Sequence, residues 1–214
     1  MTAACAALAL TWPAREAGES PLSMSAEPAS ERLALPRSGP LRGRREAALV
    51  REAQRGSSDA LEELFRRHWR RAHRAAYLVI GDAAAAEDIA QESFLAAVRA
   101  LDRFDRRRPF GPWLHRITVN RAIDFARARA LRAESALKGG EDRPAPAPDA
   151  ISDQLLAALR ELGPEHRAVV VLRYVLEYSP GEIGEILGLP RGTVNSRLRR
   201  GLDRLRPALG EVER

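Results

Sequence analysis

The sequence predicts an all-α protein in which two small helical domains are joined by a flexible linker rich in Pro and Ala. The chain has 214 residues, enough for two small domains with buried cores. Ala and Leu are abundant, aromatic residues make up only 5%, and runs of β-branched residues are nearly absent, which favours helices. We expect ordered domains at 45–132 and 153–209, the linker at 133–152, a disordered extension at 1–44 and a tail at 210–214.

The N-terminal extension is rich in Pro, Ser and Gly and lacks a helical period, as in a disordered tail. Its apolar run ACAALAL follows no basic residue and is too short to span a bilayer, so we expect neither a signal peptide nor membrane insertion. Two other interpretations of this extension are that translation starts at Met24 and that the extension is a regulatory tail. The single Cys5 excludes an internal disulfide and fits a reducing compartment, so we expect a cytoplasmic protein.

Four helices are expected in the first domain, at 45–56, 57–80, 83–104 and 113–132. Ser57 or Ser58 can cap the second helix, and Gly81-Asp82 ends it. The third helix carries an apolar stripe of Ala90, Phe94, Ala97, Val98, Leu101 and Phe104. The basic loop after it is expected to stay non-helical because of Pro109, Gly111 and Pro112.

The polar side of the third helix is acidic. Its residues are Glu87, Asp88, Gln91 and Glu92. Acidic side chains near a helix N-terminus are stabilising by about a few tenths of a kcal/mol, which is the purely structural interpretation. The functional interpretation is a docking surface for a basic partner, and these residues alone fit both.

The helix expected at 113–132 has two different sides. Leu114, Ile117 and Phe125 fall on one side, and Arg116, Asn120 and Arg127 fall on the other with Ile123 between them. Basic residues interleaved with aromatic residues and an Asn suit a single strand whose bases leave the stack. We expect Trp113 in the core, whereas Phe110 fits either role.

The second domain ends in two helices with a tight turn between them. Its first helix is expected to start after Ser152, and Gly163-Pro164 separates it from the next. Ser179 and Glu182 form a capping box around Pro180, after which Gly188 stops one helix and Pro190 starts the last.

The last helix is amphipathic. Its apolar stripe is Val194, Leu198, Leu202, Leu205 and Leu209, and its polar side carries Thr193, Ser196, Arg197, Arg200 and Arg204, flanked by Asn195 and Arg199. Such a helix suits a DNA major groove, where Arg can bind guanine and Asn adenine. A solvated basic face is the alternative, but the capped turn favours DNA, as does the net charge of +6.

Catalytic and metal-binding patterns are missing from the sequence. His68 and His73 are five positions apart and lie on different helix faces, while His115 and His166 are isolated. The chain has no phosphate-binding Gly loop and no recognisable nucleophile arrangement. We therefore expect no enzyme activity, no cofactor and no metal.

Three segments, in order and around the linker, carry a resemblance to a known family. They are EDIAQESFLAAVRALDRFD, RPFGPWLHRITVNRAIDFARAR and LGPEHRAVVVLRYVLEYSPGEIGEILGLPRGTVNSRLRRGLDRLR. Over roughly 45–209 the chain resembles sigma-70 family RNA polymerase sigma factors of the extracytoplasmic-function (ECF) type. The resemblance implies that 45–132 is a region 2-like domain and 153–209 a region 4-like domain, which direct core polymerase to promoters and promote DNA opening.

The resemblance also implies residue roles and partners. Docking on the basic coiled coil of the polymerase β′ subunit falls to Asp88, Gln91, Glu92 and Phe94. Asn120 holds a flipped minus-ten base and the loop from Arg103 to Phe110 completes its pocket, so the minus-ten set is Arg103, Phe110, Arg116, Asn120 and Arg127. Asn195, Ser196, Arg199 and Arg200 match minus-thirty-five recognition positions, to which we add Thr193 and Arg197. Arg199 stands where relatives often carry an apolar residue, which points to an altered sequence preference.

Further partners that the resemblance implies are the polymerase β flap and an anti-sigma factor, with the chain a monomer away from polymerase. A free-standing helix-turn-helix regulator is the main alternative; it needs a dimer surface and palindromic sites. An enzyme with an appended DNA-binding domain is a more distant one, because the first domain lacks a catalytic site.

Overall fold

The protein is described by a computed structural model over residues 40–135 and 153–209. These residues form α-helices, one short 3-10 helix and no strand, so the all-α prediction is confirmed. The predictions for 1–39, for 136–152 and for the tail at 210–214 lie outside the described residues.

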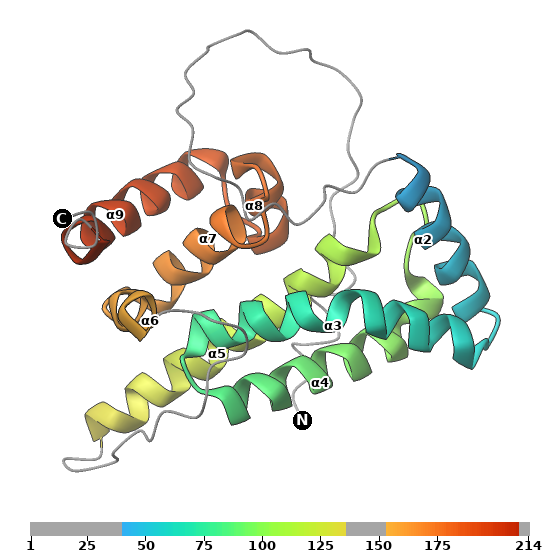
Figure 1. Ribbon diagram of the computed structural model, residues 1–214, viewed down its shortest axis with the longest axis horizontal. Helices are drawn as coiled ribbons and strands as arrows, with labels where there is room; N and C mark the ends of the chain where they lie inside the picture. Colours follow the sequence, from blue (N-terminus) through green and yellow to red (C-terminus); the bar gives the residue numbers. More distant parts are fainter. Residues whose placement is uncertain (1–39, 136–152, 210–214) are drawn as a thin grey trace, which may run out of the picture.

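The N-terminal unit contains α2 (Pro40–Ala53), α3 (Ser58–Ile80), α4 (Ala83–Ala100), the 3-10 helix η1 (Leu101–Arg103) and α5 (Phe110–Ser135). In Figure 1, α3, α4 and α5 run alongside one another, and α2 lies across one end of them. Ser57, one of the two expected caps, accepts a hydrogen bond from the Ala60 amide at 3.2 Å. Gly81 ends α3 with φ +77°, and Asp82 caps α4, so this turn agrees with the sequence.

Several helix boundaries differ from the prediction. The first helix begins at Pro40 rather than 45, and the third ends at Ala100, where η1 takes over. The fourth begins at Phe110 rather than at 113, with Pro112 in its first turn. Pro is tolerated there because the first amides of a helix have no partner within the helix, so a missing N–H breaks no bond.

Helix α5 is buried on both of the sides that the sequence distinguishes. Leu114 is buried on one side, and on the other side Arg116 is only 8% exposed and Ile123 only 7%. The helix packs against α3 and α4 and also against α7 and α8, so it is covered on more than one side. A helix surrounded in this way has no single apolar stripe, and periodicity cannot locate its exposed face.

The C-terminal unit contains α6 (Asp153–Arg160), α7 (Pro164–Tyr174), α8 (Pro180–Leu187) and α9 (Arg191–Leu209). The capping box is present: Ser179 Oγ accepts from the Glu182 amide at 3.3 Å, and Glu182 Oε2 accepts from the Ser179 amide at 2.8 Å. Gly188 has φ +68° and ends α8 as predicted.

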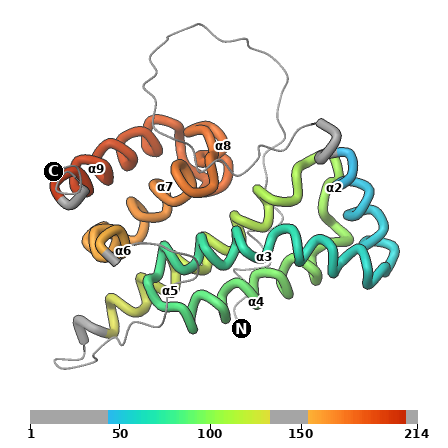
Figure 2. Tube along the Cα trace, viewed as in Figure 1, coloured from blue at the N-terminus to red at the C-terminus, as the bar shows by residue number. Residues whose placement is uncertain are grey.

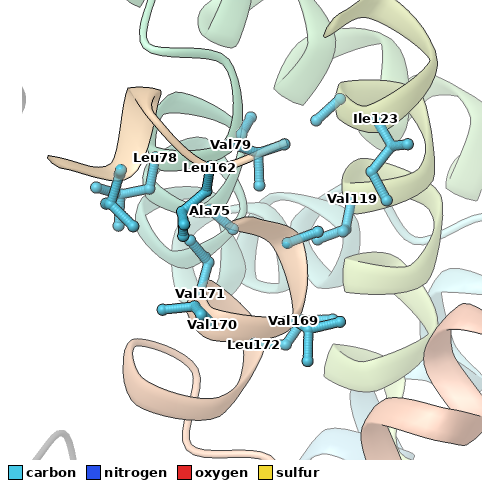
Figure 3. Packing of buried hydrophobic residues seen from close by; sticks show 14 of the residues in the cluster. Ala75, Leu78, Val79, Val119, Ile123, Leu162, Val169, Val170, Val171 and Leu172 are labelled. Atoms are coloured by element: carbon cyan, nitrogen blue, oxygen red, sulfur yellow. The ribbon is translucent and has the colours of Figure 1, made fainter. Parts of the chain in front are cut away.

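The two units share one hydrophobic core, which the sequence did not predict. Figure 3 shows Ala75, Leu78 and Val79 of α3 and Val119 and Ile123 of α5 in the same cluster as residues of α7. The trace in Figure 2 likewise shows the C-terminal helices beside α3 and α5. A second cluster, in the N-terminal unit, contains Trp113 at 6% exposure, which confirms the prediction for this ring.

Candidate nucleic-acid interface

Helix α9 presents a polar face that the rest of the unit leaves open. Asn195, Ser196, Arg199 and Arg200 are exposed, and Thr193 and Arg197 are half-buried. On the inner side Val194, Leu198 and Leu205 are buried against the core. The structure thus brings the six predicted minus-thirty-five residues together on one short segment of helix, a geometry that suits a major groove.

The turn that presents α9 depends on a close backbone approach. A Cβ on Gly184 would lie 2.6 Å from the carbonyl oxygen of Leu189, so only Gly fits there. The Leu189 amide in turn donates to the Gly184 carbonyl oxygen at 2.9 Å. The sequence predicted the N-cap of α8 at Ser179 and its end at Gly188, but it did not predict the close approach of Gly184 and Leu189.

Helix α9 is electropositive. Burial lowers the pKa of His166 on the adjoining α7, and the charges of Arg197, Arg204 and Arg200 lower it further. Asp203, the one acidic residue of α9, lies 3.7 Å from a guanidinium nitrogen of Arg206. A cationic surface of this kind attracts a polyanion.

The acidic side of α4 is open to solvent. Asp88, Gln91 and Glu92 are exposed, and Glu92 accepts a hydrogen bond from Arg121 of α5 at 2.5 Å. Phe94, the fourth predicted docking residue, is instead 7% exposed. Its ring packs 4.8 Å from that of Phe65, so it supports the surface from below.

Apolar side chains adjoin the acidic ones, which the sequence did not reveal. Leu95 is 54% exposed, Phe65 is 41% exposed, and Val98 is 45% exposed although it was expected on the buried stripe. Residues four apart on a helix share a face, so Leu95 lies beside Gln91. A surface that mixes carboxylates with exposed apolar groups suits a partner with basic and apolar residues.

The predicted minus-ten residues do not form one open surface in this arrangement. Arg103 is exposed at η1, whereas Phe110 is 4% exposed and packs against Phe104 and Trp113, with ring centroids 5.9 and 5.5 Å away. Burial lowers the pKa of Arg116, and the nearby Arg108 charge adds to the effect. DNA contacts by these residues remain a prediction.

The other two minus-ten residues lie farther along α5. Asn120 is half-buried. Arg127 is exposed, and its Nε and Nη2 donate to Oε1 of Glu165 on α7 at 2.8 and 2.6 Å. Burial alone would raise the pKa of Glu165, but the bonds and charge of Arg127 hold it below its usual value.

His115 of α5 lies in the interior. Its Nδ1 is hydrogen-bonded to the hydroxyl of Tyr178, just before α8, at 2.7 Å. Burial, with His68 and Arg71 close by, lowers the pKa of His115 to about 3, so the ring is neutral near pH 7.

The described residues contain no group of three or more His, Cys, Asp or Glu side chains that could hold a metal ion. None of the helices in residues 40–135 and 153–209 is long and apolar enough to cross a bilayer.

Two segments of the chain match models of known protein families. Residues 64–132 match Sigma-70 region 2, and residues 152–205 match Sigma-70, region 4. These spans contain most of α3, α4 and α5 and most of α6 to α9, the helices that carry the surfaces described above.

Individual relatives match across both units. The chain is 38% identical over 165 residues to the RNA polymerase sigma factor CarQ of Myxococcus xanthus, covering 74% of this chain and 94% of that one. It is 34% identical over 179 residues to the ECF RNA polymerase sigma factor SigW of Bacillus subtilis, covering 76% and 96%. Among solved structures, CnrH in complex with the cytosolic domain of CnrY is 30% identical with a TM-score of 0.60, covering 79% of this chain and 99% of CnrH.

Proposed function

The chain belongs to the ECF branch of the sigma-70 family, and we propose that it directs core RNA polymerase to specific promoters and promotes DNA opening. The observation that carries this function is the capped α8–α9 pair with its exposed polar face, in one chain with the acidic surface of α4.

Minus-thirty-five recognition is the role we propose for α9. Arg side chains can bind phosphates for affinity and guanine edges for specificity, and each good bidentate base contact contributes about 1–3 kcal/mol of discrimination. Asn195, Ser196, Arg199 and Arg200 are exposed and free of the apolar packing, so they are the base-reading candidates. Thr193 and Arg197, half-buried at the edge of this face, suit phosphate contacts.

Strand capture is the role we propose for α5 and the loop before it. Extruding a base from the duplex costs on the order of a few kcal/mol, which contacts in the pocket must offset. Asn120 offers an amide for such a base, and Arg103 offers a cation at the other end of the segment. Phe110 and Arg116 are buried, so they would hold the shape of the pocket unless the loop rearranges.

Polymerase docking is the role we propose for α4. Asp88, Gln91 and Glu92 would bind the basic coiled coil of the β′ subunit, with Phe94 supporting them from below and Leu95 adding apolar contact. The C-terminal unit would contact the β flap. The chain makes and breaks no covalent bond in this function, and it works where the chromosome lies, in the cytoplasm.

An anti-sigma factor is a further partner that we propose. The similar CnrH was solved with the cytosolic domain of CnrY, and a protein that covers the same acidic and basic surfaces would prevent both kinds of binding. We propose that the chain is a monomer when it is not bound to polymerase.

Run-off transcription tests the function directly. Bacterial core polymerase is assayed with and without the protein on a promoter library, and core binding is measured separately by co-purification. Start sites that appear only with the protein would support the proposal. A folded protein that neither binds core nor yields transcripts, while a control sigma factor does both, would contradict it. A palindromic site selected by the chain alone would instead favour a dimeric regulator.

A further inference from the structure

Gln54, the residue that follows α2, binds the chain at the start of the loop from Arg103 to Phe110, which we call the strand-capture loop. Its Nε2 donates to the carbonyl oxygens of Leu101 and Phe104 at 2.9 and 3.0 Å. Leu101 is the first residue of η1 and Phe104 follows its last. A carbonyl oxygen only accepts, so the group that faces both must be the amide NH2, whose two hydrogens suffice for both bonds. Gln54 therefore ties α2 to the chain on each side of η1.

The Phe104 carbonyl lies where helical hydrogen bonding ends. The Phe104 amide closes η1 by donating to the Leu101 carbonyl oxygen at 3.0 Å, and the backbone at Phe104 is extended, with φ −72° and ψ 127°. A carbonyl at the end of a helix has no donor within the helix. Because Phe104 is only 7% exposed, an unpaired carbonyl at this point would be costly. The amide of Gln54 supplies the donor.

The other end of the strand-capture loop is held by packing. The ring of Phe110 is buried, with its centroid 5.5 Å from that of Trp113 and 5.3 Å from that of His68 on α3. Nε2 of His68 in turn lies 2.7 Å from Oε1 of Glu46 on α2. Both ends of the loop are thus backed by the same segment, one directly by Gln54 and the other through His68.

Between these two ends the loop makes a turn of its own. The Asp105 carboxylate accepts from the Arg107 amide at 3.0 Å, and the Asp105 carbonyl oxygen accepts from the Arg108 amide at 3.0 Å. The turn leaves Arg103, Arg106 and Arg107 exposed. These local bonds fix the shape of the turn, whereas its position relative to α5 depends on how the two ends are held.

We propose that Gln54 is a positioning residue for minus-ten binding, which fixes the strand-capture loop against α5 so that an extruded base meets a pocket that is already formed. Gln54 acts through the loop and makes no contact with the base. A loop that is rigid in its binding shape loses less conformational freedom on binding, which increases affinity and discrimination. Gln54 lies outside residues 64–132, the segment that matches Sigma-70 region 2. The inference rests on the proposed strand-capture role and deepens it.

The test compares two variants of the full chain. Gln54→Met removes both donors and keeps a side chain of nearly the same length. Glu52→Met is the matched control, because it places the same side chain at an exposed position on the last turn of α2. Neither substitution alters a residue proposed to contact DNA or polymerase. Urea unfolding of the native chain and of both variants establishes the stability of each and the conditions under which each is folded.

The first measurement follows the loop in the absence of DNA. Amide hydrogen exchange at Phe104 and Arg108, whose amides are hydrogen-bonded within 101–108, should be about tenfold faster in Gln54→Met because these bonds open more often. Exchange in α9 should be unchanged, and the control variant should match the native chain throughout. Native exchange rates at 101–110 in Gln54→Met would overturn the proposal, because the loop would then not depend on Gln54.

The second measurement tests base discrimination by the complex with core polymerase. A minus-ten single strand is selected from a random library by the native complex, and each of its positions is then substituted in turn. The complex with Gln54→Met should bind the selected strand about tenfold less tightly and should lose most of its preference at the position of the extruded base. Minus-thirty-five duplex binding and co-purification with core should be unchanged. A folded variant that is less stable but keeps the native base preference would show that Gln54 is only structural, and would overturn the proposal.

The native chain separates this inference from the function on which it rests. If the native complex selects no strand and yields no run-off transcripts, while a control sigma factor does both, then the strand-capture role fails and the inference fails with it. If the native complex selects a strand and Gln54→Met retains the same base preference, then only the positioning role of Gln54 fails.

Discussion

Gly184 and Leu189 approach so closely that a Cβ on Gly184 would lie 2.6 Å from the Leu189 carbonyl oxygen. Gly184→Ala should therefore destabilise the C-terminal unit, because the atom in the way belongs to the backbone and cannot rotate aside. We expect a loss of about 1–3 kcal/mol, typical of overpacking, in urea unfolding. Gly181→Ala is the control, since its Cβ would meet its nearest neighbour at an ordinary 3.9 Å. Equal stability of the two variants would show that the turn can shift.

Arg200 is exposed on α9, and we expect its side chain to contact base edges of the minus-thirty-five duplex. Arg200→Ala should weaken binding to the preferred minus-thirty-five duplex by about 1–3 kcal/mol and weaken binding to random duplex far less. Competition binding at several salt concentrations measures both effects. An equal loss on random DNA, with a shallower salt dependence, would identify Arg200 as a phosphate contact.

Asp88 and Glu92 are exposed acids on the surface proposed to dock polymerase. Replacing both with Arg should abolish co-purification with core, because like charges would then face the basic coiled coil. Glu62→Arg, an exposed charge reversal on α3, is the matched control and should retain core binding. Intact co-purification of the double variant would exclude this surface as the docking site.

Asn120 is half-buried on α5, at the position proposed to hold an extruded base. Asn120→Ala should leave minus-thirty-five binding unchanged and impair promoter opening. Permanganate reactivity of thymines in the bubble measures the opening, and footprinting of the upstream element is the control. Normal permanganate reactivity in the variant would mean that a residue other than Asn120 holds the extruded base.

His115 should make stability depend on pH. Its pKa is about 3 in the folded chain, where burial with His68 and Arg71 nearby disfavours the charged ring, and about 6.5 when unfolded. Above pH 6.5 both states are neutral. As the pH falls from 6.5 toward 3, only the unfolded chain gains this proton, so the free energy of unfolding should decrease by about 1.4 kcal/mol per pH unit.

His115→Gln separates this residue from the other titrating groups. Gln keeps an acceptor for the Tyr178 hydroxyl but does not titrate in this range. Urea unfolding at several pH values between 5 and 7.5 should therefore show a flatter pH dependence in the variant than in the native chain. The same slope in both proteins would mean that His115 is not the responsible group.

Local signals in the sequence located the C-terminal helices well. The capping box at Ser179, the stop at Gly188 and the stripe through Val194 depend on nearby residues. The structure confirms the capping box and the stop, and it confirms the burial of Val194, Leu198 and Leu205 from the stripe. The exposed face of α9 follows from that stripe, so most of the proposed minus-thirty-five surface was predictable. The chosen residues are exposed or half-buried there, as the pattern required.

Contacts between distant segments explain what the sequence did not reveal. Arg167 is buried because carbonyl groups from α3 and α6 accept hydrogen bonds from its guanidinium, and no local pattern in the sequence indicates these partners. Val119 and Ile123 could have served a core within one domain, and nothing local distinguishes that from a core shared by two. The exposure of Leu95 likewise depends on which neighbours happen to cover it.

The shared core also has a consequence for protein synthesis. Val79 and Arg167 are 88 positions apart, so a ribosome delivers α3 and α5 well before the helices that cover them. During that interval the nascent chain displays Val119, Ile123 and the uncapped end of α3, the kind of apolar surface that chaperones bind and that promotes aggregation. A chain truncated after Ser135 would keep that apolar surface exposed permanently. Low solubility of the N-terminal unit alone would therefore result from the absence of the C-terminal unit that covers this surface, and not from misfolding of the N-terminal unit itself.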